Sequence, residues 1–387
     1  MVFDVAIVGG GASGLAVAAL LCRDTKLNIA VIERGPRAGR KLAASGNGQG
    51  NISNTHMSED KYFGSCKSIA YPIICRYGDA WKELFYGKFV TDGQGRVYPA
   101  GRQASALCDC LLKRISDGGV KLITGEQVVS IDGAEDFTLR LSGGEKITAR
   151  YVVLCTGGKS QKQFGTDGSA YSLAQKFGHK ITPLRPSLVQ LKTETTHIKT
   201  LRGIRADCIV TAFCKNERVA SSRGDVIFTE YGVSGNAVFN VSAYIADKKD
   251  VTLELEFAPE FTQEEIEKDI NLKKSCGYSQ SELLSCTLNN QIGRAVIKRS
   301  GGDSKDIAYT VKRFSLPVTG SLGFDYAQVT KGGVDASGVK GNLESKYKDN
   351  LFFAGEILDI DGACGGYNLT WAFASAAQVA AEIEKRV

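Results

Sequence analysis

The sequence predicts an α/β protein in which a parallel α/β part is interrupted by a mainly β insert and a small helical section. Residues 3–8 form an apolar, β-branched run that is followed by glycines, an alanine- and leucine-rich helix and a second strand that ends at Glu33. The same order of strand, glycine turn and helix returns at residues 351–387. Segments of strand-like composition with glycine reversals fill much of the chain between these two ends.

The segments between the two ends each have their own pattern. Residues 120–153 are typical of a meander of short strands that leads into a buried strand. Residues 187–257 are rich in threonine, valine and phenylalanine, which predicts a second, mainly β module. Pro259 then opens a section rich in glutamate and lysine, and residues 279–299 continue the helical pattern, so two or three helices are expected.

Size and composition indicate the number of domains. With 387 residues, of which 43% are hydrophobic, the chain is long enough for two or three domains of roughly 150 residues each. The chain has 44 glycines and only 7 prolines, which excludes disordered Pro/Gly-rich and collagenous proteins. We expect residues 1–186 and 316–387 to form the parallel α/β domain, residues 187–257 the β insert and residues 258–315 the helical unit.

Charge and cysteine content indicate the environment and the partners. The net charge of +6 comes without basic runs longer than two residues, so we expect no nucleic-acid partner. The eleven cysteines are irregularly spaced, which is typical of a reducing compartment, and we expect a cytoplasmic protein. The uncharged stretch from Val5 to Cys22 has glycines at its centre, so we expect neither a signal peptide nor a membrane anchor. The three histidines are scattered, and no metal site is expected.

The strongest motif is a Gly-x-Gly-x-x-Gly sequence, formed by Gly9, Gly11 and Gly14 between the first strand and the first helix. In this context the first glycine permits the turn, the second lets the backbone meet a pyrophosphate, and the third lets helix and strand pack closely. Glu33 stands 19 residues beyond Gly14, where its carboxylate can accept hydrogen bonds from a ribose. Because that carboxylate would repel a 2′-phosphate, the motif predicts bound FAD or NAD and not NADP.

Several other cofactor and catalytic motifs are missing from the sequence. It contains no second dinucleotide fingerprint, so we expect one dinucleotide in a dedicated pocket. Gly158-Lys159-Ser160 resembles the end of a P-loop, but Val153 stands where the first glycine would be required. The paired cysteines of a dithiol relay and the Gly-x-Ser-x-Gly of a serine hydrolase are also missing.

Two further glycine-rich segments have the composition of cofactor loops. Residues 39–51 combine backbone amides with the cationic Arg40 and Lys41, and they are too rich in glycine for a helix. The alternative for this segment is a flexible surface loop. Near the C-terminus, Gly355-Glu356 ends a strand and residues 365–368 open a helix, whose N-terminus suits the negative charge that grows on a reduced flavin.

With these motifs the chain resembles, over nearly its whole length, the BaiN-like and YhiN-like flavoproteins, also called the aminoacetone oxidase-like FAD-binding enzymes. The matching stretches are GGGASG (9–14), GRKLAASGNGQGNISN (39–54), GRVYPAGRQAS (95–105), TGG (156–158), FTEYGVSG (228–235), GFDYAQVTKGGV (323–334) and AGEILDIDGACGGYNLTWAFASA (354–376). The resemblance implies an α/β fold with a glutathione reductase-type, Rossmann-like FAD-binding domain, an inserted β-barrel that serves the substrate, and a small helical domain.

The resemblance, together with the loop chemistry, also implies which residues contact FAD. The predicted cofactor-binding residues are Gly9, Gly11, Ala12, Ser13, Gly14, Glu33, Arg34, Arg40, Lys41, Leu42, Ser45, Gly46, Asn47, Asn51, Val128, Thr156, Gly157, Gly355, Glu356, Gly366, Tyr367, Asn368 and Leu369. Along the cofactor, Val128 is expected near the adenine, Thr156-Gly157 near the pyrophosphate, and residues 355–356 and 366–369 near the isoalloxazine.

One segment departs from the family pattern. The family usually reads Gly-Gly-Gly-Arg-Cys-Asn where this chain reads Gly-Asn-Gly-Gln-Gly-Asn at residues 46–51. Gln49 and Gly50 therefore replace an arginine and a cysteine. For this reason the resemblance does not imply a substrate class.

These observations predict an FAD-dependent oxidoreductase that exchanges a hydride between flavin N5 and a small organic substrate. The reaction we expect is the NAD(P)H-linked reduction of an enone-type C=C bond, with NAD(P)H bound only transiently. One alternative is an oxidase of a small primary amine such as aminoacetone, which would use O₂. Another, outside the enzymes, is a flavin-binding regulatory or RNA-associated protein. The sequence predicts no oligomeric state.

Four residues are candidates for proton transfer or substrate contact, namely Tyr367, Asn51, Cys364 and Arg102. Each also has a structural alternative. Tyr367 could simply pack on the flavin, and Asn51 could hold its loop. Cys364 could be a small buried residue, and Arg102 could pair with the pyrophosphate or with a carboxylate.

Overall fold

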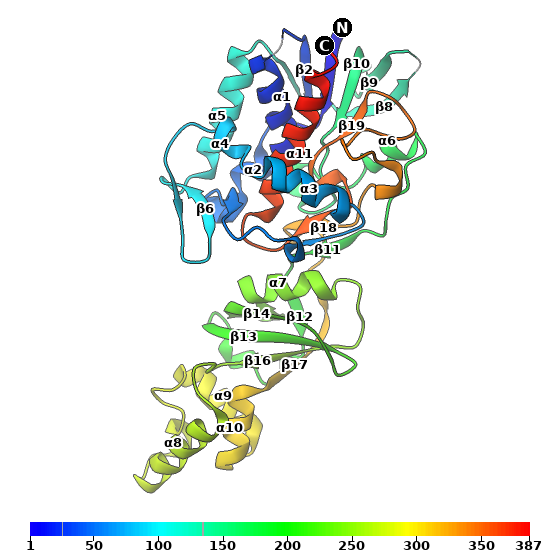
Figure 1. Cartoon of the computed structure of the whole chain (residues 1–387). Helices are drawn as coiled ribbons and strands as arrows, with labels where there is room; N and C mark the ends of the chain where they lie inside the picture. Colours follow the sequence, from blue (N-terminus) through cyan, green and yellow to red (C-terminus); the bar gives the residue numbers. More distant parts are fainter. Residues whose placement is uncertain (25, 134) are drawn as a thin grey trace. The chain divides into compact units, whose positions relative to one another are not determined.

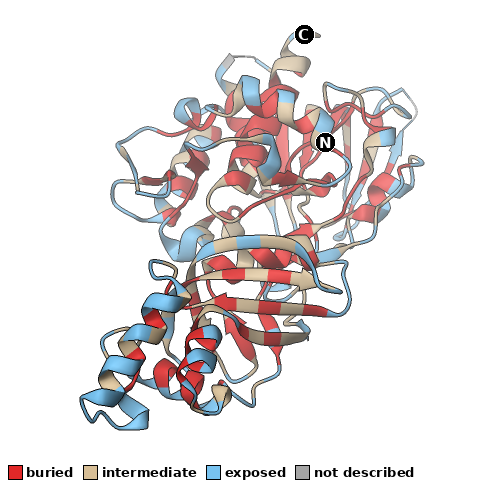
Figure 2. Cartoon of the chain, turned by 60° about the horizontal axis from the view of Figure 1, so that its bottom comes forward, coloured by how far each residue is buried: buried red, intermediate tan, exposed pale blue. Residues whose placement is uncertain are grey.

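The computed structural model describes residues 1–24, 26–133 and 135–387, and it divides into two compact units (Figure 1). Unit 1 comprises Met1–Arg185 and Val329–Val387, and unit 2 comprises Pro186–Gln328. Unit 1 has a mixed parallel and antiparallel sheet with helices, and unit 2 has a closed barrel, which confirms the predicted fold class. In each unit the buried residues concentrate in the strands and in the helices that cover them (Figure 2).

A seven-stranded sheet forms the centre of unit 1. Its strands follow the order β7-β2-β1-β10-β9-β8, and β19 also pairs with β10. They are β1 (Val2–Val8), β2 (Ile29–Glu33), β7 (Lys121–Thr124), β8 (Val128–Gly133), β9 (Phe137–Leu141), β10 (Lys146–Leu154) and β19 (Leu351–Phe353). The pairs among β7, β2, β1, β10 and β19 are parallel. The loops that follow these strands therefore leave from one edge of the sheet, where α/β proteins bind their ligands.

The meander predicted for residues 120–153 is right only in part. Strands β8, β9 and β10 form antiparallel pairs, as expected. Strand β7, however, lies on the other side of the sheet, where Lys121 to Thr124 pair in parallel with β2. Residues 146–154 form one continuous strand, because its first half pairs with β9 and its last three residues pair with β19.

Helices and short strands complete unit 1. The helices are α1 (Ala12–Asp24), α2 (Arg40–Ala43), α3 (Lys67–Tyr77), α4 (Trp81–Leu84), α5 (Ala104–Asp117), α6 (Tyr171–Gln175) and α11 (Tyr367–Glu384). The short strands are β3 (Ser53–Asn54), β5 (Phe89–Thr91) and β6 (Arg96–Pro99) in one sheet, and β4 (Tyr62–Phe63) and β20 (Asp361–Gly362) in another. Single 3₁₀ turns are η1 (Ser45–Gly48), η2 (Glu59–Lys61), η3 (Lys162–Phe164), η6 (Ala336–Gly338) and η7 (Gly355–Ile357).

Helices α1 and α11 pack against each other in the middle of unit 1 (Figure 1). Small side chains make this contact close, because Ala16 and Ala19 of α1 and Ala376 of α11 are fully buried. Helix α1 follows β1 of the central sheet through a glycine turn, and α11 follows the short strand β20 through a glycine turn. The start of α11 is held near the end of β19, because the Trp371 indole donates to the Gly355 carbonyl oxygen at 3.1 Å. The N-terminal N–H groups of both helices, which have no partner within the helix, therefore lie near the carboxyl edge of the central sheet.

Unit 2 is a closed six-stranded barrel with a cluster of helices. The barrel order is β12-β15-β14-β13-β16-β17. Its strands are β12 (Leu191–Thr193), β13 (Arg205–Cys214), β14 (Glu217–Phe228), β15 (Gly232–Ser234), β16 (Val251–Glu256) and β17 (Phe314–Ser321). The helices are α7 (Asn236–Ile245), α8 (Gln263–Ser275), α9 (Asn290–Ser300) and α10 (Ser304–Lys312), with the 3₁₀ turns η4 (Lys199–Leu201) and η5 (Gln280–Glu282). Strands β11 (Arg185–Ser187) and β18 (Val329–Lys331) lie where the chain passes between the units.

The barrel and its helices share one hydrophobic core, which explains why they form one compact unit. That core includes Leu253 from β16, Ile266 from α8, Ile292 from α9 and Ile307 from α10. Strand β17 follows the helices in the chain and closes the barrel between β16 and β12. Residues 316–328 accordingly belong to unit 2, whereas the sequence analysis placed the return to the α/β domain at residue 316.

In unit 2 one helix was not predicted, and one local prediction was wrong. Helix α7 lies within the segment that was expected to be mainly β. Its apolar side chains are buried in the core of the barrel, and this packing stabilises a helix there. Residues 279–289 were expected to be helical, but they form η5 and turns, and α9 begins only at Asn290, behind an Asn289 side chain that caps it. Across the described residues, no helix has the length and apolar character that spanning a membrane requires.

Candidate FAD site

The three glycines of the Gly-x-Gly-x-x-Gly motif have two different roles in the structure. A Cβ atom at Gly14 would lie 1.9 Å from the Gly9 carbonyl oxygen, and one at Gly9 would lie 2.4 Å from the carbonyl oxygen of Cys155. These two glycines are needed by the packing of the protein itself. A Cβ atom at Gly11 would meet no atom within 4 Å. Gly11 therefore presents its backbone to open space at the start of α1, as expected of a residue that approaches a pyrophosphate.

Glu33 lies beside this loop, at the end of β2. Its carboxylate accepts hydrogen bonds from the Gly10 amide at 2.9 Å and from the Gly35 amide at 2.7 Å. The Glu126 amide donates to the Glu33 carbonyl oxygen, which brings the start of β8 and the buried Val128 to the same end of the sheet. The structure thus brings together Glu33 and Val128, the two residues that were predicted for the adenosine side of the cofactor.

Arg34 and Arg40, two basic residues that were predicted to contact FAD, bind residues 163–169, a segment that was not predicted to be part of the site. The Arg34 guanidinium donates to both carboxylate oxygens of Asp167 at 2.8 Å and to the Ser169 hydroxyl at 3.1 Å. Arg40 donates to the Gln163 carbonyl oxygen. The guanidinium of Arg34 holds the pKa of Asp167 well below its usual range. Residues 161–169 are therefore fastened across the end of β2, close to the predicted ribose site.

The predicted residues Lys41 and Glu356 meet in space. The Lys41 ammonium nitrogen lies 2.8 Å from one carboxylate oxygen of Glu356, and the Thr330 amide donates to the other at 2.8 Å. Both charged side chains are largely buried, at 25% and 20% exposure, so water screens this ion pair only in part. The pair fastens the short helix α2 to the turn η7, which follows β19.

The segment at residues 39–51 is more ordered than a flexible surface loop. It contains the short helix α2 and the turn η1, which corrects the expectation that it holds no helix. Left-handed backbone angles, with φ of 57°, 55°, 82° and 77° at Gly46, Asn47, Gly48 and Gly50, turn the chain sharply after the helix. Leu42 is 2% exposed and packs in the core, so only its backbone could reach a cofactor.

The C-terminal glycine turns pack against the first loop and against β3. A Cβ atom at Gly355 would lie 2.6 Å from the Ser13 hydroxyl, and one at Gly366 would lie 2.2 Å from the Ser53 carbonyl oxygen. The Asn368 amide group binds the backbone of Gly362 at 2.7 and 2.8 Å, which fixes the turn before α11. Leu369, which follows, is half-buried. The structure therefore brings the predicted residues of both ends of unit 1 to one place.

The described residues fit FAD. The hydroxyl oxygens of Ser45 and Thr156 are buried and have no hydrogen-bond partner within the described part of the chain. Buried polar groups are almost always paired, so these two point to a ligand. The open backbone at Gly11 and the N-termini of α1 and α11 suit the anionic pyrophosphate and the flavin ring. Ala12, Ser13 and Gly157 stand in the same turns at the sheet edge.

Among the catalytic candidates, Tyr367 and Asn51 are buried. The Tyr367 hydroxyl donates to the His56 carbonyl oxygen at 3.1 Å, and burial raises the pKa of this phenol. Its ring lies edge-on to Tyr62, with centroids 5.9 Å apart. Asn51 donates to the carbonyl oxygens of Ser53 at 3.0 Å and of Val97 at 3.1 Å. Asn51 therefore holds its loop, which was the structural alternative for this residue.

The other two candidates, Cys364 and Arg102, lie near β6. Burial raises the pKa of the Cys364 thiol to about 11, so the thiol is protonated at neutral pH. The Arg102 guanidinium stacks over the Tyr98 ring, 3.9 Å from its centroid, and donates to the Gln49 side chain at 3.3 Å. The chain thus uses Gln49, which departs from the family pattern, to hold Arg102. No phosphate or carboxylate partner is involved in these contacts.

Three residues of the site were missed from the sequence. Thr330 is fully buried and binds Glu356, Asn54 donates to the Gly365 carbonyl oxygen at 2.9 Å, and Asp167 pairs with Arg34. Thr330 and Asn54 lie inside stretches that resemble the family, so a signal was available for them. Asp167 had none, because its partner stands 133 positions away in the chain.

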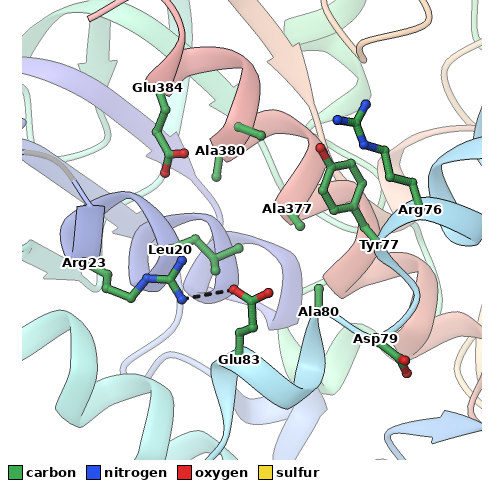
Figure 3. A pocket seen from close by; sticks show the side chains of 11 residues that line it. Leu20, Arg23, Arg76, Tyr77, Asp79, Ala80, Glu83, Ala377, Ala380 and Glu384 are labelled. Carbon is green, nitrogen blue, oxygen red and sulfur yellow. Dashed lines mark hydrogen bonds and ion pairs between the residues drawn. The ribbon is translucent and has the colours of Figure 1, made fainter.

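A cavity of about 230 Å³ lies elsewhere in unit 1 (Figure 3). It is lined by the last turns of α1, by the chain around α3 and α4, and by the second half of α11. Its lining includes Leu20 and Ala380, and also Arg23 and Glu83, which form an ion pair of 3.1 Å. None of the predicted cofactor or catalytic residues lines it, so this cavity is separate from the candidate FAD site.

Comparisons with known proteins agree over the whole chain. The family described as HI0933-like protein Rossmann domain matches residues 3–382. The 3-dehydro-bile acid delta(4,6)-reductase of Clostridium scindens is 32% identical over 395 residues, which cover 96% of each chain. The ribosomal RNA dihydrouridine synthase of Escherichia coli is 27% identical and covers 97% of this chain and 96% of its own. The solved structure of 3-ketosteroid delta1-dehydrogenase from Sterolibacterium denitrificans matches all of both chains with a TM-score of 0.54 and 14% identity, which shows the shared fold.

Proposed function

Because this chain belongs to the family of HI0933-like proteins with a Rossmann domain and is a flavin-dependent oxidoreductase, we propose that it reduces a C=C bond conjugated to a carbonyl group. The observation that carries the proposal is the chemistry shared by its relatives. One is named a delta(4,6)-reductase of a 3-dehydro-bile acid, and another is named a dihydrouridine synthase. Dihydrouridine differs from uridine by saturation of a ring C=C bond next to a carbonyl, so both names describe the same bond change.

FAD and individual residues of the chain would have separate roles in this reaction. Bound FAD supplies the hydride chemistry, and the protein supplies position and charge. Reduction of an enone also needs a proton at the carbon next to the carbonyl. Tyr367 is our candidate for this proton, because it stands at the start of α11 among the predicted flavin contacts and a phenol is protonated at neutral pH. Arg102, held by Tyr98 and Gln49, is our candidate for contact with the substrate.

We propose a small molecule as the substrate and NAD(P)H as the transient reductant. A net charge of +6 without basic runs supports a small substrate over a nucleic acid. The second candidate substrate is a uridine of ribosomal RNA, favoured by the relatives of Escherichia coli and Haemophilus influenzae, which are 27% and 26% identical over nearly the whole chain. The eleven free cysteines support work in a reducing compartment such as the cytoplasm.

Anaerobic titration of the FAD-loaded protein tests the proposal. We expect NADH or NADPH to bleach the flavin absorbance, and a 3-keto steroid with a conjugated C=C bond to restore it with formation of the saturated product. The same reduced protein is offered an unmodified ribosomal RNA transcript, in which dihydrouridine is measured by mass spectrometry. Bleaching by aminoacetone, together with reoxidation only by O₂, would overturn the proposal in favour of an amine oxidase.

A further inference from the structure

We propose that Thr330 is a positioning residue for the flavin cofactor, which it serves by holding two cofactor loops in a fixed relation. One loop is the turn at residues 156–158, expected at the pyrophosphate, and the other carries Glu356, expected at the isoalloxazine. The inference rests on the flavin-dependent function proposed above. Thr330 is not one of the residues that were predicted to contact FAD. It would act on the cofactor indirectly, through Glu356 and through the backbone of residues 159–160.

Thr330 is fully buried on β18, and both its hydroxyl and its backbone amide have partners. Its hydroxyl oxygen accepts hydrogen bonds from the amides of Lys159 at 2.7 Å and Ser160 at 3.0 Å. The Ser160 hydroxyl lies 3.0 Å from the same oxygen. The backbone amide of Thr330 donates to Glu356 at 2.8 Å. One residue thus joins the chain after β10 to the turn after β19.

The residues around the Thr330 hydroxyl pack closely against it. A Cβ atom at Gly158 would lie 2.5 Å from the Thr330 hydroxyl oxygen and 3.0 Å from a carboxylate oxygen of Glu356. Only glycine at position 158 lets the three groups approach so closely. The other carboxylate oxygen of Glu356 binds Lys41, so the contacts of Thr330 extend through Glu356 to the short helix α2. The Thr330 hydroxyl therefore binds one predicted cofactor segment, its backbone amide binds a second, and Glu356 links the second to a third.

Replacing the hydroxyl by a methyl group should disturb these segments without changing the shape of the side chain. In Thr330→Val, the part-buried amide of Lys159 and the buried amide of Ser160 lose their acceptor. Buried donors without a partner are costly, so the turn at residues 156–158 should move to satisfy them. We expect the dissociation constant of FAD to rise by about tenfold or more. Thr330→Ser keeps the hydroxyl and should stay within about threefold of the natural protein.

The experiment compares Thr330→Val, Thr330→Ser and a matched control, Thr310→Val. Thr310 is also buried and its hydroxyl donates within α10 to the Asp306 carbonyl oxygen at 2.7 Å, so the control loses a similar hydroxyl in unit 2. Each protein is freed of FAD and titrated with it, and the flavin fluorescence, the visible spectrum of bound flavin and the thermal midpoint without FAD are recorded. We expect weaker binding and a changed flavin spectrum for Thr330→Val alone.

Several outcomes would overturn the inference. Thr330→Val could bind FAD with the natural affinity and spectrum, or Thr330→Ser could lose affinity as strongly as valine, which would assign the effect to the methyl group. If Thr330→Val does not fold, Thr330→Cys replaces the oxygen by a weaker acceptor and should give an intermediate loss of affinity. Failure of the proposed function would give a different result from failure of this inference, because the natural protein would then bind FAD but leave the enone unreduced.

Discussion

At the scale of single residues, the structure separates glycines that the fold needs from a glycine that the cofactor needs. We predict that Gly11→Ala leaves the stability of the FAD-free protein unchanged or slightly higher, because a Cβ atom there meets nothing within 4 Å. The same change should weaken FAD binding by about tenfold or more, since the backbone must approach the pyrophosphate. Gly14→Ala, whose Cβ atom would lie 1.9 Å from Gly9, should instead destabilise the FAD-free protein by about 3 kcal/mol.

Thermal unfolding of both variants without FAD, followed by FAD titration, measures the two effects separately. If Gly11→Ala binds FAD with the natural affinity, the pyrophosphate does not pass over Gly11 and the assignment of this loop is wrong.

Tyr367 allows a second test at the residue scale. We predict that Tyr367→Phe keeps FAD but lowers the rate of enone reduction about 100-fold, because the variant lacks the proton donor. The half-reaction in which NAD(P)H bleaches the flavin should keep its rate, and stopped-flow absorbance separates the two half-reactions. Tyr347→Phe is the matched control, since Tyr347 packs on His179 away from the candidate site residues. Equal loss in both half-reactions would show that Tyr367 has only a structural role.

How far the sequence predicts the site depends on the distance along the chain between partners. The roles of Gly9, Gly14 and Glu33 were predicted from a motif within one strand-helix-strand unit. In the structure Gly9 and Gly14 allow the close packing that the motif requires, and Glu33 lies beside the glycine loop. The contacts of Thr330 and Asp167 join residues far apart in sequence, and no local pattern encodes them. Asn51 holds its own loop, which was the structural alternative for this residue, and of its two partners only Val97 is distant in the chain.

At the scale of elements, the end of α11 is fixed by a buried carboxylate. Glu344 accepts two hydrogen bonds from Arg386 at 2.7 and 3.1 Å, and it also binds Lys340 at 3.0 Å and the Asn350 amide at 3.0 Å. Burial alone would raise the pKa of Glu344, but Arg386, the Asn350 amide and Lys340 together lower it from 4.5 to about 2. This group therefore stabilises the folded protein above pH 4.5, and its contribution disappears as the pH falls toward 2.

We predict that Glu344→Gln removes this pH dependence. At pH 7 the variant should be less stable than the natural protein by up to about 3 kcal/mol, the value that corresponds to the lowered pKa. The difference should shrink as the pH approaches 2, where the carboxylate of the natural protein is protonated. Urea unfolding at a series of pH values measures this. A difference that stays constant with pH would mean that shape and not charge is responsible.

Element boundaries show where local patterns are reliable. Strand β1, the fingerprint turn and α1 were predicted because their apolar runs and glycines are contiguous. Strand β7 was assigned to the wrong partner, because a short strand carries no signal of which neighbour it pairs with. Helix α7 was missed, because its valines and phenylalanine suit a strand as well as a buried helix, and only its packing on the barrel decides.

At the scale of the whole molecule, closure of the barrel is the feature that the sequence could not show. The barrel needs β17, which follows three helices in the chain, and local composition does not reveal that a strand returns to complete an earlier sheet. The predicted contacts with FAD nevertheless all fall within one compact unit. They come from Met1–Arg185 and Val329–Val387, although the chain of unit 2 separates these segments.

Hydrogen exchange with and without FAD tests this division of the molecule. We predict that FAD slows amide exchange in unit 1, above all at residues 9–14, 39–51 and 354–369, because a ligand that binds only the folded state stabilises the unit that holds it. At 100 times the dissociation constant the gain is about 2.7 kcal/mol, which slows exchange through opening of unit 1 about 100-fold. The barrel strands β12–β17 should exchange as before. Gly11→Ala is the control and should lose the protection at equal FAD concentration. Strong FAD-dependent protection within Pro186–Gln328 would instead make the barrel part of the cofactor site.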